Sequence, residues 1–249
     1  MSYLEIFNDA NTVLLDDSYS CFGLAISGTA TLGRVDAQAE NVCGAVDVFY
    51  TPPVGASMPI IAIQPQANVP MTVGRMQYAN GQYRWRIHCS TYNVTVKYWI
   101  FNIPSQMPDA GGLFQAWDSA GRMVFDSDFK FPRIVDVVNR TMNPDPAQNP
   151  SAPNPTWSPI VYPGNKQYAF ITTTYCNSFA IFTYERPPGN VWVTGIDWFD
   201  YGFWFQGSTL NGSAYRYVGQ TSGPIGPPVG KYLSANAGLM VIDVTNMYF

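Results

Sequence analysis

One passage near the start of the chain recurs in its middle. Residues 4–19 read LEIFNDANTVLLDDSY, and residues 114–129 read FQAWDSAGRMVFDSDF. A shift of 110 residues moves Asp16 onto Asp126 and superimposes the two passages without a gap. Each copy places alternating apolar and polar residues on both sides of a turn, which is the pattern of a β-hairpin. Because two copies are too few for a solenoid or a propeller, the repeat predicts two similar β units.

Polar residues at the turn and at the end of each hairpin predict how it is held together. Asn8 and Asp118 begin turns in which their side chains can bond to nearby backbone groups, and Gly121 can adopt a positive φ. Asp16 and Asp126 end the second strand of each copy, where a carboxylate is expected to accept backbone N–H bonds. We therefore assign Asp16 and Asp126 a hairpin-closing structural role.

The composition favours strands over helices along the whole chain. Aromatic residues make up 15% of the sequence, beside 20 prolines and 21 glycines, whereas only 12% of the residues are charged. This mixture is typical of short strands joined by tight turns. Strict alternation in residues 83–90 and 93–101 marks two such strands. The sequence therefore predicts an all-β fold with little helix.

The repeat also divides the chain into two predicted domains. Residues 1–108 form an N-terminal β-sandwich-like domain and residues 109–249 a C-terminal one, and each is opened by one copy of the hairpin. A linker is expected over residues 102–112. Residues 143–159 are rich in Pro, Asn and Ser, which predicts a long Pro-rich loop and no helix.

Charge and hydropathy exclude several functional classes. The net charge of −4 and the isoelectric point near 4.8 argue against a nucleic-acid-binding protein, which needs a basic surface. The start of the chain lacks a basic segment followed by an apolar run, so no signal peptide is expected. The apolar stretches have the length of strands, which predicts no membrane insertion. Four cysteines without short spacings are expected to be reduced and buried: Cys21, Cys43, Cys89 and Cys176.

Residues with catalytic potential are few. His88 is the only histidine, which excludes metal sites built on several histidines, and it stands inside a predicted strand. No phosphate-binding loop or nucleophile-elbow motif occurs. Asp197 and Asp200 could form a glycosidase pair only at a defined separation across a sugar bond, and sequence proximity does not establish that separation. We therefore predict that the protein is not an enzyme and has no catalytic residues, bound metal or cofactor.

The most suggestive feature is a run of aromatic residues at 191–207, VWVTGIDWFDYGFWFQG. Successive side chains of a strand point to opposite faces, so some of these rings are expected to face outward. Outward rings could form subunit contacts or stack on sugars. Arg84 and Arg86 share one face of a predicted strand, where they pair with an acidic neighbouring subunit or are solvated. The candidate interface or glycan-stacking residues are Trp192, Trp198, Phe199, Tyr201, Phe203 and Trp204.

The segment GLFQAWDSAGRMVFDSDFKFPRIVDVV, residues 112–138, resembles the pattern G-L-x-V-[FW]-[ND]-x-x-G-x-x-x-F-D-S of small tail-tip or baseplate-associated proteins of siphophage-type bacteriophages. The N-terminal copy of the hairpin, with PIIAIQP (59–65) and VKYWIFNIP (96–104), is similar to the same family. The sequence departs from the pattern at Asn11 and Asp17, where the family has Gly and Ser. The resemblance ends at about residue 138.

The resemblance implies a structural protein of the virion, located at the tail tip and assembled in the cytoplasm of the host bacterium. Its implied partners are other phage tail proteins, among them host-specificity, central-fibre and tail-tip proteins, and it implies no catalytic residues. A homotrimer is the first choice for the oligomeric state. The second hypothesis is a carbohydrate-binding, receptor-binding protein that contacts a glycan or protein of the host surface. A glycan-degrading enzyme ranks below both.

Overall fold

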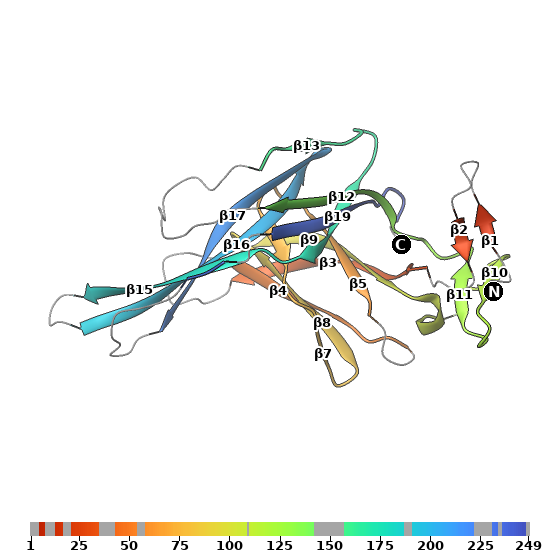
Figure 1. Cartoon of the computed structure of the whole chain (residues 1–249), viewed down its shortest axis with the longest axis horizontal. Helices are drawn as coiled ribbons and strands as arrows, with labels where there is room; N and C mark the ends of the chain where they lie inside the picture. The colour runs from red at the N-terminus through yellow and green to blue at the C-terminus, as the bar shows by residue number, and fades with distance from the viewer. Residues whose placement is uncertain are drawn as a thin grey trace.

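The computed structural model describes residues 5–7, 13–16, 21–34, 43–53, 58–108, 110–141, 157–186, 191–221, 231–233 and 236–247 (Figure 1). In these ranges the chain forms strands and one short 3-10 turn, η1, Pro104–Gln106. The predicted all-β fold with little helix is confirmed. The strands are β1 (Glu5–Phe7), β2 (Val13–Asp16), β3 (Gly23–Arg34), β4 (Gly44–Tyr50), β5 (Ile60–Pro65), β6 (Met71–Val73), β7 (Gln77–Ala79), β8 (Gln82–Cys89), β9 (Val94–Asn102), β10 (Gln115–Trp117), β11 (Met123–Asp126), β12 (Arg133–Thr141), β13 (Ile160–Val161), β14 (Tyr168–Thr174), β15 (Asn177–Arg186), β16 (Val191–Gln206), β17 (Thr209–Thr221), β18 (Lys231–Leu233) and β19 (Asn236–Asp243).

The two copies of the repeated passage form the same hairpin. β1 pairs with β2, and β10 with β11, as separate two-stranded antiparallel sheets. Glu5 lies opposite Asp16 in the first hairpin, and Gln115 lies opposite Asp126 in the second. Both hairpins also have a register shift at the same place. It lies between Ile6 and Phe7 in the first hairpin and between Ala116 and Trp117, 110 residues later, in the second. The repeat in the sequence is therefore a repeat in backbone structure.

The repeat continues past the hairpins into the main sheet. β3 and β12 begin 110 residues apart, and each has a bulge at its second and third residues. After the bulge, Ile26 lies opposite Ile100 of β9, and Asp136 lies opposite Val241 of β19. β9 then pairs with β5, and β19 pairs with β14. The triplets β3-β9-β5 and β12-β19-β14 are therefore equivalent.

The two triplets join edge to edge and form one layer. Its strand order is β12-β19-β14-β5-β9-β3. If each strand is replaced by its equivalent, the same order results, read from the other end of the layer. The facing layer is also built from two triplets of strands, β4-β8-β6 from the first half and β16-β17-β13 from the second. The triplets meet at β6 and β16, where Met71 lies opposite Phe203. β3 also pairs with β4 at Gly33, so a single sheet curls into both layers. β15 lies beside the first half of β16 and carries β18 on its other edge.

The predicted domain boundary at residue 108 falls in the connection between β9 and β10, but each layer contains strands from both halves. One hydrophobic core between the layers also draws on both halves, for example on Ile63 and Phe170. A smaller second core covers the outer face of the first layer, where Trp99 Nε1 donates to the Met247 carbonyl oxygen at 3.0 Å. The two halves thus form one sandwich in which neither half keeps a core of its own.

Burial along β8 follows the predicted alternation, with Trp85, Ile87 and Cys89 buried and the intervening residues partly or fully exposed on the other face. The four cysteines are free thiols, and all but Cys21 are buried. No helix in the described part of the chain is long and apolar enough to span a membrane. The predicted Pro-rich loop, residues 143–159, lies outside the described residues except at its end, where Trp157 is buried in the core.

Candidate functional site

Two of the six candidate aromatic residues lie inside the sandwich. Tyr201 and Phe203 are each 1% exposed and belong to the core between the layers. The ring centroid of Phe203 lies 5.0 Å from that of Trp157. The expectation of an outward ring is therefore corrected for these two residues, because this part of β16 faces the other layer. Trp204, on the opposite face, is half-buried, and the side chains of Trp192, Trp198 and Phe199 lie outside the described residues.

Asp126 sits at the end of β11 and is fully buried. Its carboxylate accepts hydrogen bonds from the Asp128 backbone N–H at 2.8 Å and from Gln115 Nε2 at 2.7 Å. Burial raises the pKa of this carboxyl, but the hydrogen bonds from Asp128, Gln115, Gly112 and Ala110 together outweigh burial and hold the pKa below its ordinary value. Asp16 has the equivalent backbone position opposite Glu5, and its side chain lies outside the described residues.

The two arginines of β8 pair within their own chain. Arg84 Nη2 lies 2.7 Å from Asp47 Oδ2, and Arg86 Nε lies 2.9 Å from Asp47 Oδ1. An acidic neighbouring subunit is therefore not needed as their partner. His88, further along the same strand, has its pKa lowered to about 4, first by burial and then by the charge of Arg86. Its imidazole is neutral at physiological pH.

Of the two carboxylates considered for glycan hydrolysis, only that of Asp200 belongs to a described side chain, and it is buried. Asp200 is 5% exposed and accepts a hydrogen bond from the Tyr175 hydroxyl at 2.5 Å. Burial raises the pKa of Asp200 to about 6, although the bond from Tyr175 acts in the opposite direction. The side chain of Asp197 lies outside the described residues. Nor does the described part of the chain bring three His, Cys, Asp or Glu side chains together at a spacing suited to a metal ion.

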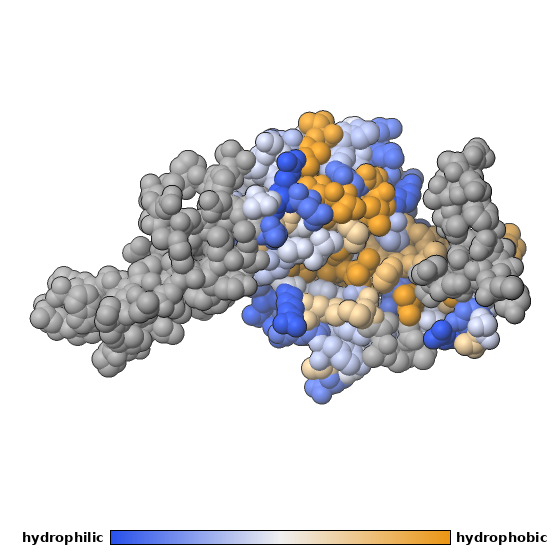
Figure 2. All heavy atoms as spheres, in the orientation of Figure 1, coloured by the Kyte–Doolittle hydropathy of each residue, from blue (hydrophilic) through white to orange (hydrophobic). Residues whose placement is uncertain are grey.

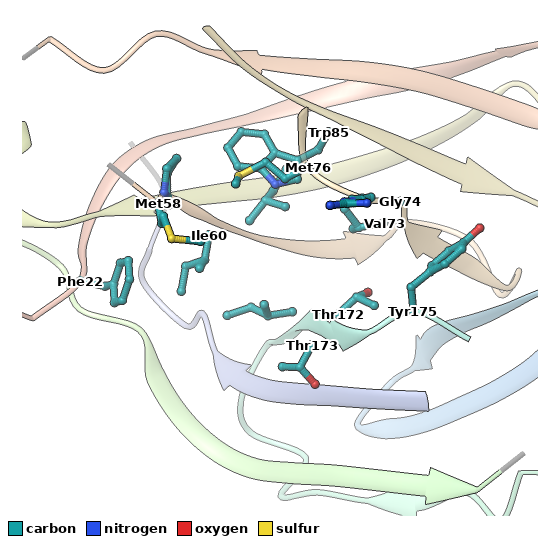
Figure 3. Close-up of a pocket in the computed structure, with 14 residues that line it drawn as sticks. Phe22, Met58, Ile60, Val73, Gly74, Met76, Trp85, Thr172, Thr173 and Tyr175 are labelled. Carbon is teal, nitrogen blue, oxygen red and sulfur yellow. The ribbon is translucent and has the colours of Figure 1, made fainter. Parts of the chain in front are cut away.

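A cleft of about 680 Å³ lies at the junction of the two halves (Figure 3). It opens where β5 and β14 meet, and its other wall is formed by residues 73–76 after β6 and by Trp85 of β8. The register of β5 and β14 contains one residue pair, Phe170 opposite Ile63. Ile61 and Thr172 occupy the next positions of this register without pairing, and both line the cleft.

Two local features separate the strands at this place. β14 has a bulge at Thr173, because Thr172 lies opposite Leu239 but Thr174 lies opposite the next residue, Gly238. A bulge bends its strand and increases the local twist. Pro59, just before β5, has no N–H to donate to a neighbouring strand. Together they end the pairing of β5 with β14.

The lining of the cleft is mainly apolar. Trp85 and Val73 form a buried wall, and Met58, which is 75% exposed, stands at the rim. Figure 3 shows Met76 beside Trp85 on one side of the space and Thr172 on the other. Thr172 Oγ1 is buried and has no hydrogen-bond partner among the described residues. A buried hydroxyl of this kind is rare in folded proteins and is normally satisfied by water or a ligand.

The sequence analysis singled out none of these lining residues. They come from segments that are far apart in the chain, and the visible signals were only Pro59 at a strand start and the run Thr172–Thr174. No protein-family model, curated protein or solved structure matches the chain significantly.

Proposed function

We propose that the protein is a structural component of a bacteriophage tail tip or baseplate that also contributes to host-surface recognition. The observation that carries this proposal is the duplicated hairpin. The segment on which the resemblance rests forms the same hairpin twice, with the same register and the same bulge, and each copy precedes an equivalent set of strands. A duplicated element with no described cluster of catalytic groups supports an architectural role.

The elongated shape of the molecule suits a protein that connects two neighbours in an assembly. Figure 1 shows the two hairpins at one end of the sandwich and the extension formed by β15, β16 and β17 toward the other end. The two ends thus offer separate places for different neighbours in an assembly.

Strand β12 supports an assembled state. Among the described strands it is the terminal one of its layer and pairs with β19 alone, and three of its apolar residues are exposed: Ile134 at 53%, Val135 at 42% and Val137 at 57%. Figure 2 shows apolar side chains gathered over β12 and β13, where Val161 is 73% exposed. Soluble monomers normally protect such edges with charge or cover them, so an apolar edge favours contact with another chain.

Cryo-electron microscopy of the source virion tests the proposal. We expect density for this fold at the distal end of the tail, with the copies related by cyclic symmetry and threefold as the first choice. Mass spectrometry of purified particles provides the matched control for presence. A protein that is missing from particles and is monomeric in solution contradicts the proposal.

A second candidate function, carbohydrate binding, is favoured by a specific surface feature. Phe49 is 51% exposed at a shallow hollow of about 350 Å³ on the outer face of β4, β7 and β8. Around it, Gln82 Nε2 donates to Thr51 Oγ1 at 3.2 Å, and Arg84 Nη1 donates to Gln77 Oε1 at 3.3 Å. A ring beside amides and a guanidinium can stack on a sugar and bond its hydroxyls.

A glycan array probed with the wild type and with Phe49→Ala tests this second function. Tyr78→Ala is the matched control, because Tyr78 is 49% exposed but packs on Tyr83 with ring centroids 4.5 Å apart. Carbohydrate binding predicts that Phe49→Ala abolishes a signal that Tyr78→Ala retains. An array with no wild-type signal counts against the function.

A further inference from the structure

The internal repeat allows the cleft, which is lined by β5 of the first half, to be compared with the equivalent place in the second half. On the far side of β9 and β19, Ile100 pairs with Ile61 and its equivalent Val241 pairs with Phe170. Ile61 and Phe170 are therefore equivalent positions of the repeat. The same alignment places Pro59 with Tyr168, two residues earlier in each strand.

Equivalent positions carry rings in one half and smaller side chains in the other. Phe170 and Tyr168 pack on Phe205, with ring centroids 6.4 Å and 5.8 Å away. Their equivalents Ile61 and Pro59 line the cleft. The second half is thus filled by aromatic rings where the first half leaves an apolar space of about 680 Å³, which is wide enough to admit an aromatic side chain.

The cleft also offers main-chain partners. Ile60 and Ile61 of β5 face Thr172 and Thr173 of β14 across the opening, and none of these residues pairs across the β5–β14 boundary. Exposed strand edges accept an extended peptide by main-chain hydrogen bonds, while pockets beside the edge take alternate side chains. The buried Thr172 hydroxyl adds a polar group without a partner in the described structure. Flexible methionines at the rim, Met58 and Met76, can adapt to an entering ring.

We infer that the cleft binds an aromatic side chain presented on an extended segment of a different, partner protein. The ring occupies the space beside Ile61 and Trp85, and the main chain of the segment lies along Ile60 and Ile61, which have no pair on the β14 side of β5. This inference does not depend on the tail-tip proposal, since it rests only on the asymmetry of the repeat and on the interrupted pairing of β5 with β14.

Methyl NMR of the full chain with ¹³C-labelled methionine tests the inference directly. The probe peptides are acetyl-Thr-Phe-Thr-amide and acetyl-Thr-Ala-Thr-amide, each added to about 10 mM, a concentration that detects dissociation constants near 1 mM. We expect the Phe peptide to shift the methyl resonances of Met58 and Met76 and to leave that of Met123, in hairpin strand β11, unchanged. The Ala peptide is expected to shift none of them. Unmoved Met58 and Met76 signals, or equal shifts at Met123, overturn the inference.

A variant that copies the second half of the repeat supplies the blocking control. Ile61→Phe introduces the residue that the second half carries at Phe170, so it should fill the cleft and reduce the shifts caused by the Phe peptide at least tenfold. Ile134→Phe, at a position 53% exposed on β12, is the matched control and should retain them. If Ile61→Phe fails to fold, Met76→Phe at the rim serves the same purpose. Undiminished shifts in the folded blocking variant overturn the inference.

Light scattering, which measures the mass in solution, tests whether the cleft is occupied instead by a second copy of the chain. The inference predicts that Ile61→Phe and the wild type have the same mass in solution. A wild-type oligomer that Ile61→Phe dissociates assigns the cleft to contact between copies and overturns the assignment to a different partner.

Discussion

Replacing Asp126 by alanine should destabilise the second hairpin by about 3 kcal/mol. The carboxylate accepts two short bonds, 2.8 Å from the Asp128 N–H and 2.7 Å from Gln115 Nε2, while the contact with the Gly112 N–H at 3.4 Å is too long to add much. A hydrogen bond to a charged acceptor contributes about 1.5 kcal/mol at the lower end, and two such bonds give the expected loss. Asp126 is fully buried, so alanine leaves the donors without water as a substitute.

Hydrogen exchange at the Asp128 amide measures this loss where it occurs. A change of about 3 kcal/mol corresponds to exchange roughly a hundred-fold faster, because about 1.4 kcal/mol is a factor of ten. Asp126→Asn is the matched variant: its carbonyl oxygen can still accept from the Asp128 N–H, so the acceleration should be smaller. Equal protection of Asp128 in the wild type and in Asp126→Ala would refute the hairpin-closing role.

The pH dependence of the same hairpin has a definite sign. Because the folded pKa of Asp126 is lowered, its stabilisation is fully present above the pKa of an unfolded aspartate, about 3.9. It is lost as the pH falls through the lower folded pKa. Exchange of the Asp128 amide, corrected for its intrinsic rate, should therefore rise at acid pH in the wild type but not in Asp126→Ala.

Three further predictions concern the sandwich. Phe203→Ala should lower the free energy of unfolding by about 3–5 kcal/mol in urea titrations, because the ring is 1% exposed in the core; the half-buried Trp204→Ala should cost less, and equal losses would contradict their opposite faces. Asp47→Asn removes the negative charge that pairs with two partly exposed arginines, so a loss of about 1 kcal/mol is expected that shrinks in high salt. Asp200 has a pKa raised to about 6, so the folded state binds more protons than the unfolded chain between about pH 4 and 6. Wild-type stability should fall by about 2–3 kcal/mol as the pH rises through that window, relative to Asp200→Asn, and parallel pH curves would contradict the burial of this carboxyl.

Several features of the fold were predictable because they depend on neighbouring residues. The hairpins follow from turn residues and alternating polarity within 16-residue passages, and the paired strands β1–β2 and β10–β11 confirm them. Alternation in β8 correctly separated Trp85 from Arg84 and Arg86. The predicted boundary at residue 108 came from the same repeat, but how the halves join depends on contacts that no local pattern encodes.

The aromatic run shows where such reasoning stops. Alternation predicts that one face of β16 is buried, but which face depends on the layer that packs against it. Phe203 is buried because Trp157 and Phe170, from other parts of the chain, lie against it. In the same way, Asp47 of β4 reaches Arg84 only because β4 and β8 are neighbours in the sheet.

By itself, the sequence determined the strands, the duplicated hairpin and the scarcity of catalytic groups, since each is set by residue type and by spacing over short distances. Only the tertiary structure decided that the two halves share both layers of one sandwich, and that an apolar cleft remains between β5 and β14. The physical reason is that space inside a protein is the difference between the room left by the backbone and the volume of side chains from several distant segments. Ile61 and Phe170 occupy equivalent places in the repeat, and their difference in volume acquires meaning only when the surrounding strands are assembled.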